Sequence, residues 1–170
     1  PYVLVVKKDF AATDVASFIA EVKRQNGIPY GSPGVGTVGH LAGALLASRA
    51  GITLEHLPYR GGSEAARDVA AGNLDAAIGS ANSLKPVMES GRGRGIALTS
   101  GERRGPLAAT LPTIAESGFP GFDLTSWNGI FAPAATPREV IARFEAAAAH
   151  ATNDPSTREK LEASGNDPVT

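Results

Sequence analysis

Apolar residues fall along this chain in short β-rich runs and in longer stretches with helical spacing. Residues 2–7, YVLVVK, are apolar and β-branched, as in a buried strand. In residues 15–22 the apolar side chains fall at i, i+3, i+4 and i+7, which predicts a helix that Thr13 or Asp14 caps and Gly27 ends. The chain therefore opens with a strand followed by an amphipathic helix.

The same unit recurs as far as residue 99. Repeated strand-then-helix units with short connections predict an α/β fold, in which a mainly parallel sheet is flanked by helices on both faces. Further strands are predicted at residues 28–31, 54–59, 74–79 and 96–99. Further helices are predicted to begin at about Thr37, at Ser63 and at Asn82 or Ser83, and to end at Gly51, Gly72 and Gly91.

The alternation of predicted strands and helices stops after Ser100. Residues 101–121 are rich in glycine and proline and hold at most one short helix, near residues 113–117. Residues 122–133 are predicted to be extended. A capping box, Thr136-Pro137-Arg138-Glu139, opens a helix that runs to about Asn153. Asp154-Pro155 starts a last helix that ends at Gly165.

Composition narrows the possible partners. The 170 residues are 42% hydrophobic, enough for a packed domain. The net charge of −1 provides no field that attracts nucleic acid or an anionic membrane. The chain has no cysteine, which excludes disulfides and thiolate metal sites, and its three histidines lack metal-binding spacing. No apolar run approaches the roughly 20 residues of a membrane span, and no signal peptide opens this chain.

The stretch YGSPGVGTVGHLAG, residues 30–43, contains a GxGxxG motif at Gly34, Gly36 and Gly39. A dinucleotide site also needs an acidic residue at the tip of the next strand, but that strand ends in Pro58-Tyr59-Arg60. An NAD(P)-dependent oxidoreductase is therefore only an alternative interpretation. The sequence also lacks a GxSxG nucleophile motif and an evident pair of catalytic carboxylates, so we do not expect an enzyme.

The same loop suits a smaller anion. Its glycines allow close approach of a ligand, and the backbone N–H groups of residues 36–39 would form the first turn of a helix, where they have no internal partner. Ser32 and Thr37 add hydroxyl groups beside these donors. The alternative is purely structural, with Thr37 capping the helix and the glycines making the turn.

Six ordered motifs that cover nearly the whole chain resemble the second lobe of the Bug family. These are the periplasmic solute-binding proteins of tripartite tricarboxylate transporters, also called the TctC family. The motifs are YGSPGVGTVGHLAG at residues 30–43, PYRG at 58–61, GNLDA at 72–76, ALTS at 97–100, LPTIAESGFPG at 111–121 and TSWNGIFAP at 125–133.

The resemblance implies a truncated periplasmic-binding-protein-like lobe of type II. Residues 1–6 would be a crossing strand from the first lobe, and residues 7–124 the second, ligand-binding lobe. Residues 125–170 would be the returning crossing strand and helices of the first lobe. The abrupt ends, at Pro1 and at residues 168–170, fit a piece of a longer protein.

The resemblance also implies a function. The protein would bind a small organic carboxylate in the periplasm, without cofactor or metal, and deliver it to membrane transporter subunits without entering the membrane itself. Many family members carry an aspartate where Gly79-Ser80-Ala81 stands, so its absence here favours anionic over amine-bearing ligands. Tyr59 could instead simply finish its strand, and residues 80–82 could be a plain helix cap. The implied ligand-binding residues are Ser32, Gly36, Thr37, Val38, Gly39, Tyr59, Ser80 and Ala81.

Overall fold

A computed structural model describes the chain except for residues 1, 106, 165, 167, 169 and 170. In the described residues, five strands form one sheet in the order β3-β2-β4-β1-β5. Of the sequence-based features, Pro1, the helix end at Gly165 and residues 169–170 lie outside the described residues. The strands are β1 (Tyr2–Lys7), β2 (Ile28–Ser32), β3 (Leu54–Pro58), β4 (Ala76–Ser80) and β5 (Gly93–Leu98).

The sheet is mainly parallel, as predicted, with one reversed strand. β2 runs parallel to both β3 and β4. β1 lies between β4 and β5 and is antiparallel to each of them. The carboxyl ends of β2, β3, β4 and β5 therefore meet at one edge of the sheet, and the amino end of β1 lies at the same edge.

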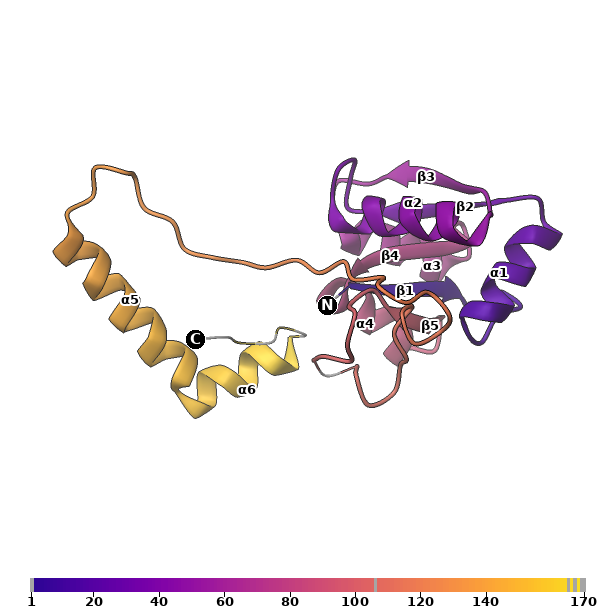
Figure 1. Cartoon of the computed structure of the whole chain (residues 1–170). Coiled ribbons are helices and arrows are strands. Elements are labelled where there is room, and N and C mark those ends of the chain that lie inside the picture. Colours follow the sequence, from indigo (N-terminus) through magenta and orange to yellow (C-terminus); the bar gives the residue numbers. More distant parts are fainter. Residues whose placement is uncertain (1, 106, 165, 167, 169–170) are drawn as a thin grey trace.

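Helices cover both faces of this sheet (Figure 1). On one face α1 (Val15–Arg24) and α2 (Val38–Ala50) pack with Leu4 and Val6 of β1. On the other face α3 (Gly62–Ala71) and α4 (Ala81–Glu89) pack with Val3 and Val5. β1 is thus buried on both sides, which explains why its sequence is a continuous apolar run instead of an alternating one.

Helix starts agree with the sequence in α1 and α2 and differ in α3 and α4. Asp14 caps α1 by accepting the Ser17 N–H, as predicted. α3 begins after Gly61, two residues before the expected cap at Ser63. α4 begins after Ser80 instead of at Asn82 or Ser83, because the Ser80 hydroxyl accepts the Ser83 N–H at 3.3 Å.

Beyond the sheet, one short-range prediction holds and one is wrong. Residues 114–118 form turns, within the predicted limit of at most one short helix there, and Thr113 and Glu116 exchange reciprocal hydrogen bonds. The capping box at residue 136 does not form. Pro137 has ψ of 139°, which is not helical, so the helix starts one residue later and Glu139 falls at its second position instead of its third.

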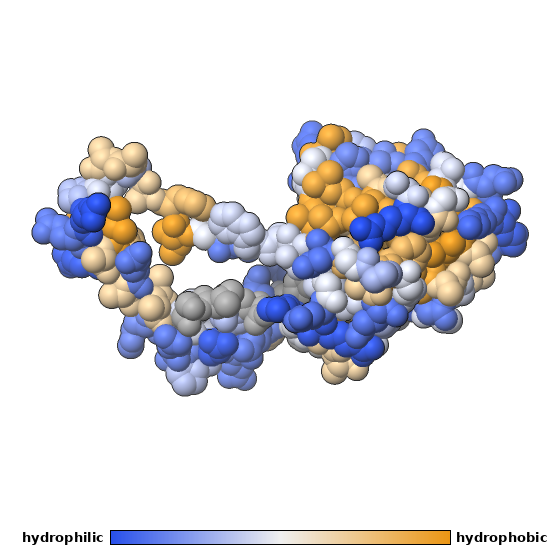
Figure 2. All heavy atoms as spheres, viewed as in Figure 1, coloured by the Kyte–Doolittle hydropathy of each residue, from blue (hydrophilic) through white to orange (hydrophobic). Residues whose placement is uncertain are grey.

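Residues 125–163 form an arm that extends away from the sheet (Figure 1). Residues 125–133 are extended, as predicted, but form no strand, and residues 134–136 make a turn. They lead to α5 (Arg138–Asn153) and α6 (Pro155–Ala163), neither of which has a buried residue in the part that the structure describes. Figure 2 shows hydrophobic surface exposed on the arm. The large apolar side chains exposed there are Trp127, Ile130, Phe131 and Phe144.

Candidate functional site

The loop from Ser32 to Thr37 joins the end of β2 to α2 at the sheet edge where the parallel strands end. Gly39 brings the start of α2 directly over this edge, because a Cβ atom at Gly39 would lie only 2.3 Å from the carbonyl oxygen of Ile78 in β4. The start of α2 and the end of β4 therefore lie side by side. Open α/β sheets bind ligands at this kind of edge.

Three backbone donors at the start of α2 are unused. Thr37 is the N-cap residue, yet its side chain makes no capping bond and instead donates to the Gly34 carbonyl at 2.8 Å. Within the described residues, the N–H groups of Val38, Gly39 and His40 have no hydrogen-bond partner, and the first helical bond comes from Leu41. Free N–H groups at a helix start favour an anion.

Two of the donors that the sequence singles out already have partners. The Gly36 N–H lies two residues before the first of the free donors and donates to Nδ1 of His40 at 3.0 Å. The Thr37 N–H donates to the Gly34 carbonyl at 3.4 Å. Gly36 also precedes α2 instead of lying in its first turn, and its φ of +78° is a left-handed conformation that favours glycine.

Behind the loop, His40 and His56 stack on each other. Their ring centroids are 4.2 Å apart with an interplanar angle of 23°. The His56 Nε2 lies 2.7 Å from the hydroxyl of Ser32, which also contacts the Gly34 backbone. Burial and then the neighbouring His40 lower the pKa of His56. Sequence spacing did not reveal this pair, because a helix and a strand bring it together.

Tyr59 and Ser32 are occupied by other protein groups. The Tyr59 hydroxyl donates to the Asp68 carboxylate at 2.7 Å, and burial together with this bond raises the pKa of Tyr59 to about 12. Ser32 is fully buried, and its hydroxyl is shared between His56 and Gly34. In this conformation both residues support the loop and the sheet edge.

A cleft of about 1110 Å³ opens between the sheet edge and the arm. Ser80 and Asn82 line it, whereas Ala81 is buried beside them and Ser80 also caps α4. Ser100, just after β5, lines the same cleft and is only 1% exposed. Its hydroxyl has no hydrogen-bond partner among the described residues.

An unpaired buried hydroxyl is unfavourable unless another molecule bonds to it. Ser100 is thus a candidate site residue that the sequence analysis missed. The sequence does contain a pattern that points to Ser100, because it is the last residue of the ALTS motif at the carboxyl end of a predicted strand.

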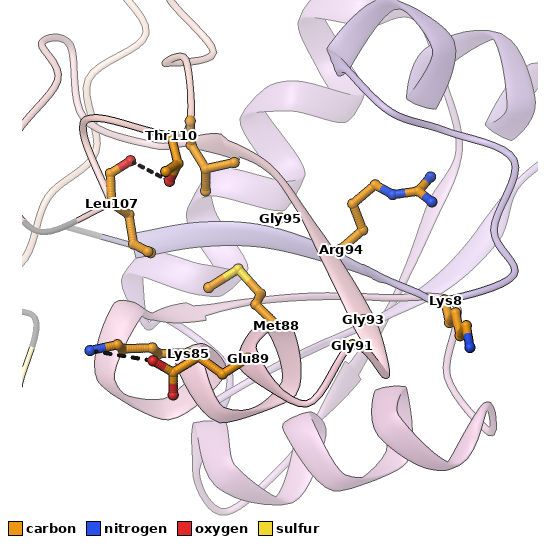
Figure 3. A pocket seen from close by; sticks show the side chains of 11 residues that line it. Lys8, Lys85, Met88, Glu89, Gly91, Gly93, Arg94, Gly95, Leu107 and Thr110 are labelled. Atoms are coloured by element: carbon orange, nitrogen blue, oxygen red, sulfur yellow. Dashed lines mark hydrogen bonds and ion pairs between the residues drawn. The ribbon is translucent and has the colours of Figure 1, made fainter.

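A second hollow, of about 480 Å³, lies at the opposite edge of the sheet. Figure 3 shows that its basic side chains, Lys8, Lys85 and Arg94, do not converge on a common point. Lys85 pairs with Glu89 at 3.6 Å, and Arg94 donates to the Ala12 carbonyl at 2.8 Å. This hollow therefore offers no focused anion site.

Two other kinds of site find no support in the structure. In the described residues no cluster of three metal-binding side chains occurs. No helix in the described part of the chain has the length and apolar character needed to cross a bilayer.

Comparison with known proteins gives consistent matches over the whole chain. The family model for the tripartite tricarboxylate transporter family receptor matches residues 1–170. A relative from Pseudomonas sp. (strain P51), the UPF0065 protein in the tcbD-tcbE intergenic region, is 40% identical over 167 residues. That alignment covers 97% of this chain and 49% of the relative.

Solved structures agree in fold. Rhodopseudomonas palustris Rpa4515, solved with adipate, is 32% identical with a TM-score of 0.91, covering 99% of this chain and 56% of that one. MatC (Rpa3494) from the same organism, solved with bound malate, is 26% identical with a TM-score of 0.84, covering 97% and 56%. The chain thus spans about half the length of the proteins that it matches.

Proposed function

Because the chain belongs to the tripartite tricarboxylate transporter receptor family, we propose that it is part of a periplasmic solute-binding protein that delivers a small organic carboxylate to membrane transporter subunits. The observation that carries this proposal is the start of α2, where the N–H groups of Val38, Gly39 and His40 are free in the described structure. A carboxylate supplies the acceptor oxygens that these donors lack. The protein acts by binding and not by catalysis, and it needs no cofactor.

A dicarboxylate is the ligand class that best fits the site. Adipate and malate, which occupy two structures of this fold, each carry two carboxyl groups. One carboxylate would meet the free N–H groups of α2. The orphan hydroxyl of Ser100 and the polar residues Ser80 and Asn82 offer hydrogen bonds to other polar groups of the ligand.

The arm fits the proposed division into lobes. Residues 2–124 share the sheet and its two cores, whereas α5 and α6 bury no residue of their own in the described structure. Helices with apolar side chains and no core are incomplete structural units. We propose that residues 125–170 pack against a first lobe of the kind that the longer relatives have the length to contain, and that the ligand lies between the two lobes.

Binding of dicarboxylates and of dinucleotides separates this function from the oxidoreductase alternative. We expect adipate or malate at millimolar concentration to raise the melting temperature of the protein, and NAD and NADP to leave it unchanged. Stabilisation by a dinucleotide alone would reverse the assignment. The comparisons give the oxidoreductase no support.

Val38→Pro tests the carboxylate contact within the same experiment. Val38 is the first helical residue after Thr37, which has φ −74° and ψ 162°, so proline fits there without distorting the backbone. The change removes one donor and is expected to weaken dicarboxylate binding roughly tenfold. Arg138→Pro, at the first position of α5, is the matched control and should leave binding unchanged.

Ser100→Ala is expected to weaken ligand binding without lowering the stability of the protein. Removal of an unpaired buried hydroxyl is expected to keep the unfolding free energy within about 0.5 kcal/mol of wild type, or to raise it. If Ser100 contacts the ligand, dicarboxylate affinity falls roughly fivefold. Calorimetric titration and thermal unfolding measure the two effects, and unchanged affinity would remove Ser100 from the site.

A further inference from the structure

The loop from Ser32 to Thr37 contains a contact that competes with anion binding. The Gly36 N–H donates to Nδ1 of His40, one turn later in the chain. Nδ1 can accept this bond only while it carries no proton. His40 in this arrangement is therefore a neutral imidazole with its proton on Nε2, and the Gly36 N–H is turned away from any ligand.

We propose that His40 is a protonation-sensitive latch of the loop, which withholds the Gly36 N–H from a carboxylate when neutral and releases it when protonated. A proton on Nδ1 turns the acceptor into a second donor, so the bond to Gly36 breaks. The resulting imidazolium also places a positive charge beside the loop. Both changes favour an anion, and this inference rests on the carboxylate site proposed above.

His56 keeps the latch in place and limits the pair to one positive charge. Ser32 contacts His56 Nε2, the Gly34 carbonyl and the Gly34 N–H at 2.7, 3.1 and 3.2 Å. One hydroxyl satisfies all three contacts only if His56 Nε2 is the donor to it. Because the rings stack at 4.2 Å, two positive charges would repel each other strongly.

Among the described residues, the aromatic ring that faces the pair carries no charge that would fix its protonation. His40 of α2 faces His56 of β3, and His56 in turn faces the ring of Tyr30 of β2 at 5.1 Å. Tyr30 is neutral, since burial raises its pKa to about 12, and its hydroxyl donates to the His40 carbonyl at 3.0 Å. No ion pair reaches either imidazole within the described residues.

The surroundings of His56 disfavour a positive charge on that ring. Burial, and then the proximity of His40, lower the pKa of His56, so His56 stays neutral to a lower pH than an ordinary imidazole. His56 can then keep its Nε2 proton and its bond to Ser32 while His40 is protonated. By linkage, if protonation tightens ligand binding, ligand binding must take up protons.

Two substitutions separate the two states of the latch. Asn at position 40 offers an oxygen near the place of Nδ1 but does not titrate, so His40→Asn keeps the loop latched at every pH. His40→Ala removes the acceptor and the charge, so Gly36 is free at every pH. His150, on the exposed arm helix α5, supplies the matched control, His150→Ala.

Adipate titrations at pH 6.0 and 8.0 test the latch, because carboxyl groups ionise mostly below this range and imidazole titrates within it. We expect wild type and His150→Ala to bind adipate roughly fivefold more tightly at pH 6.0. Both substitutions of His40 should bind with little pH dependence, and His40→Ala should exceed wild type at pH 8.0. A pH dependence that persists in His40→Ala would overturn the proposal.

The Gly36 amide signal in an NMR titration without ligand tests the latch on its own. It should shift between pH 8.0 and 6.0 together with the His40 ring signals, and it should stay fixed in His40→Ala. A Gly36 signal that ignores His40 would refute the latch. Absence of adipate binding at both pH values would count against the proposed function, while the Gly36 signal still decides the latch.

Discussion

Gly39→Ala is expected to destabilise the lobe by about 3 kcal/mol, which corresponds to a drop of roughly 10 °C in melting temperature. A Cβ atom at this position would lie 2.3 Å from the Ile78 carbonyl oxygen and 3.1 Å from atoms of Ser32 and Pro33. The nearest of these atoms belongs to the backbone of the central sheet, which cannot move aside at low cost. The start of α2 would have to lift away from the sheet edge.

Gly61→Ala is the matched control for this clash. Its Cβ would meet no atom within 4 Å, and its φ of −170° is ordinary extended backbone. We expect a loss of about 1 kcal/mol or less, because alanine is a poorer N-cap residue than glycine. Thermal and urea unfolding of both variants measure the difference, and equal stabilities would mean that α2 is not held against β4 as the structure shows. In that case the free N–H groups of α2 would not lie at the sheet edge either.

A protease that cleaves after aromatic residues is expected to cut within residues 125–136 roughly a hundred times faster than within residues 2–124, the sheet domain. Trp127 and Phe131 are 76% and 79% exposed in a segment without regular structure. Phe18 and Phe122, by contrast, are fully buried. Cleavage should release the arm and leave a resistant fragment that ends near residue 127.

Substitution of the cleavage residues controls this result. Trp127→Ala with Phe131→Ala should slow release of the arm without changing the unfolding transition of the sheet domain. If the arm packs on a first lobe, the same bonds should resist cleavage in a protein that contains that lobe. Rapid cleavage within residues 2–122 of the present chain would contradict the separation between sheet domain and arm.

The parts of the fold that local sequence determines were predicted closely. β1, α1 and α2 follow from apolar spacing, Asp14 and the stop at Gly51. The direction of β1 could not be predicted, since a buried apolar strand reads the same in either orientation. Helix starts were predicted wrongly where a strand runs directly into a helix, as at Ser80. One residue there ends the strand and also caps the helix.

The sequence indicates where the candidate site lies in the fold, but not which groups contact each other there. The glycine loop and the start of α2 follow from the motif, and their positions at the sheet edge follow from the α/β pattern. The partner of each donor depends on contacts between elements that are distant in sequence. The Gly36–His40 bond, the His40–His56 stack and the orphan hydroxyl of Ser100 appear only when the sheet and α2 are assembled.

The reversed strand β1 sets the order in which the lobe can be completed. Val3 pairs with Gly79 on one side and with Leu98 on the other. During synthesis β1 must wait for β4 before it can pair on one side, and for β5 before it can pair on the other. Pairing between such distant segments slows folding, so the nascent chain remains open until nearly the whole lobe has been made.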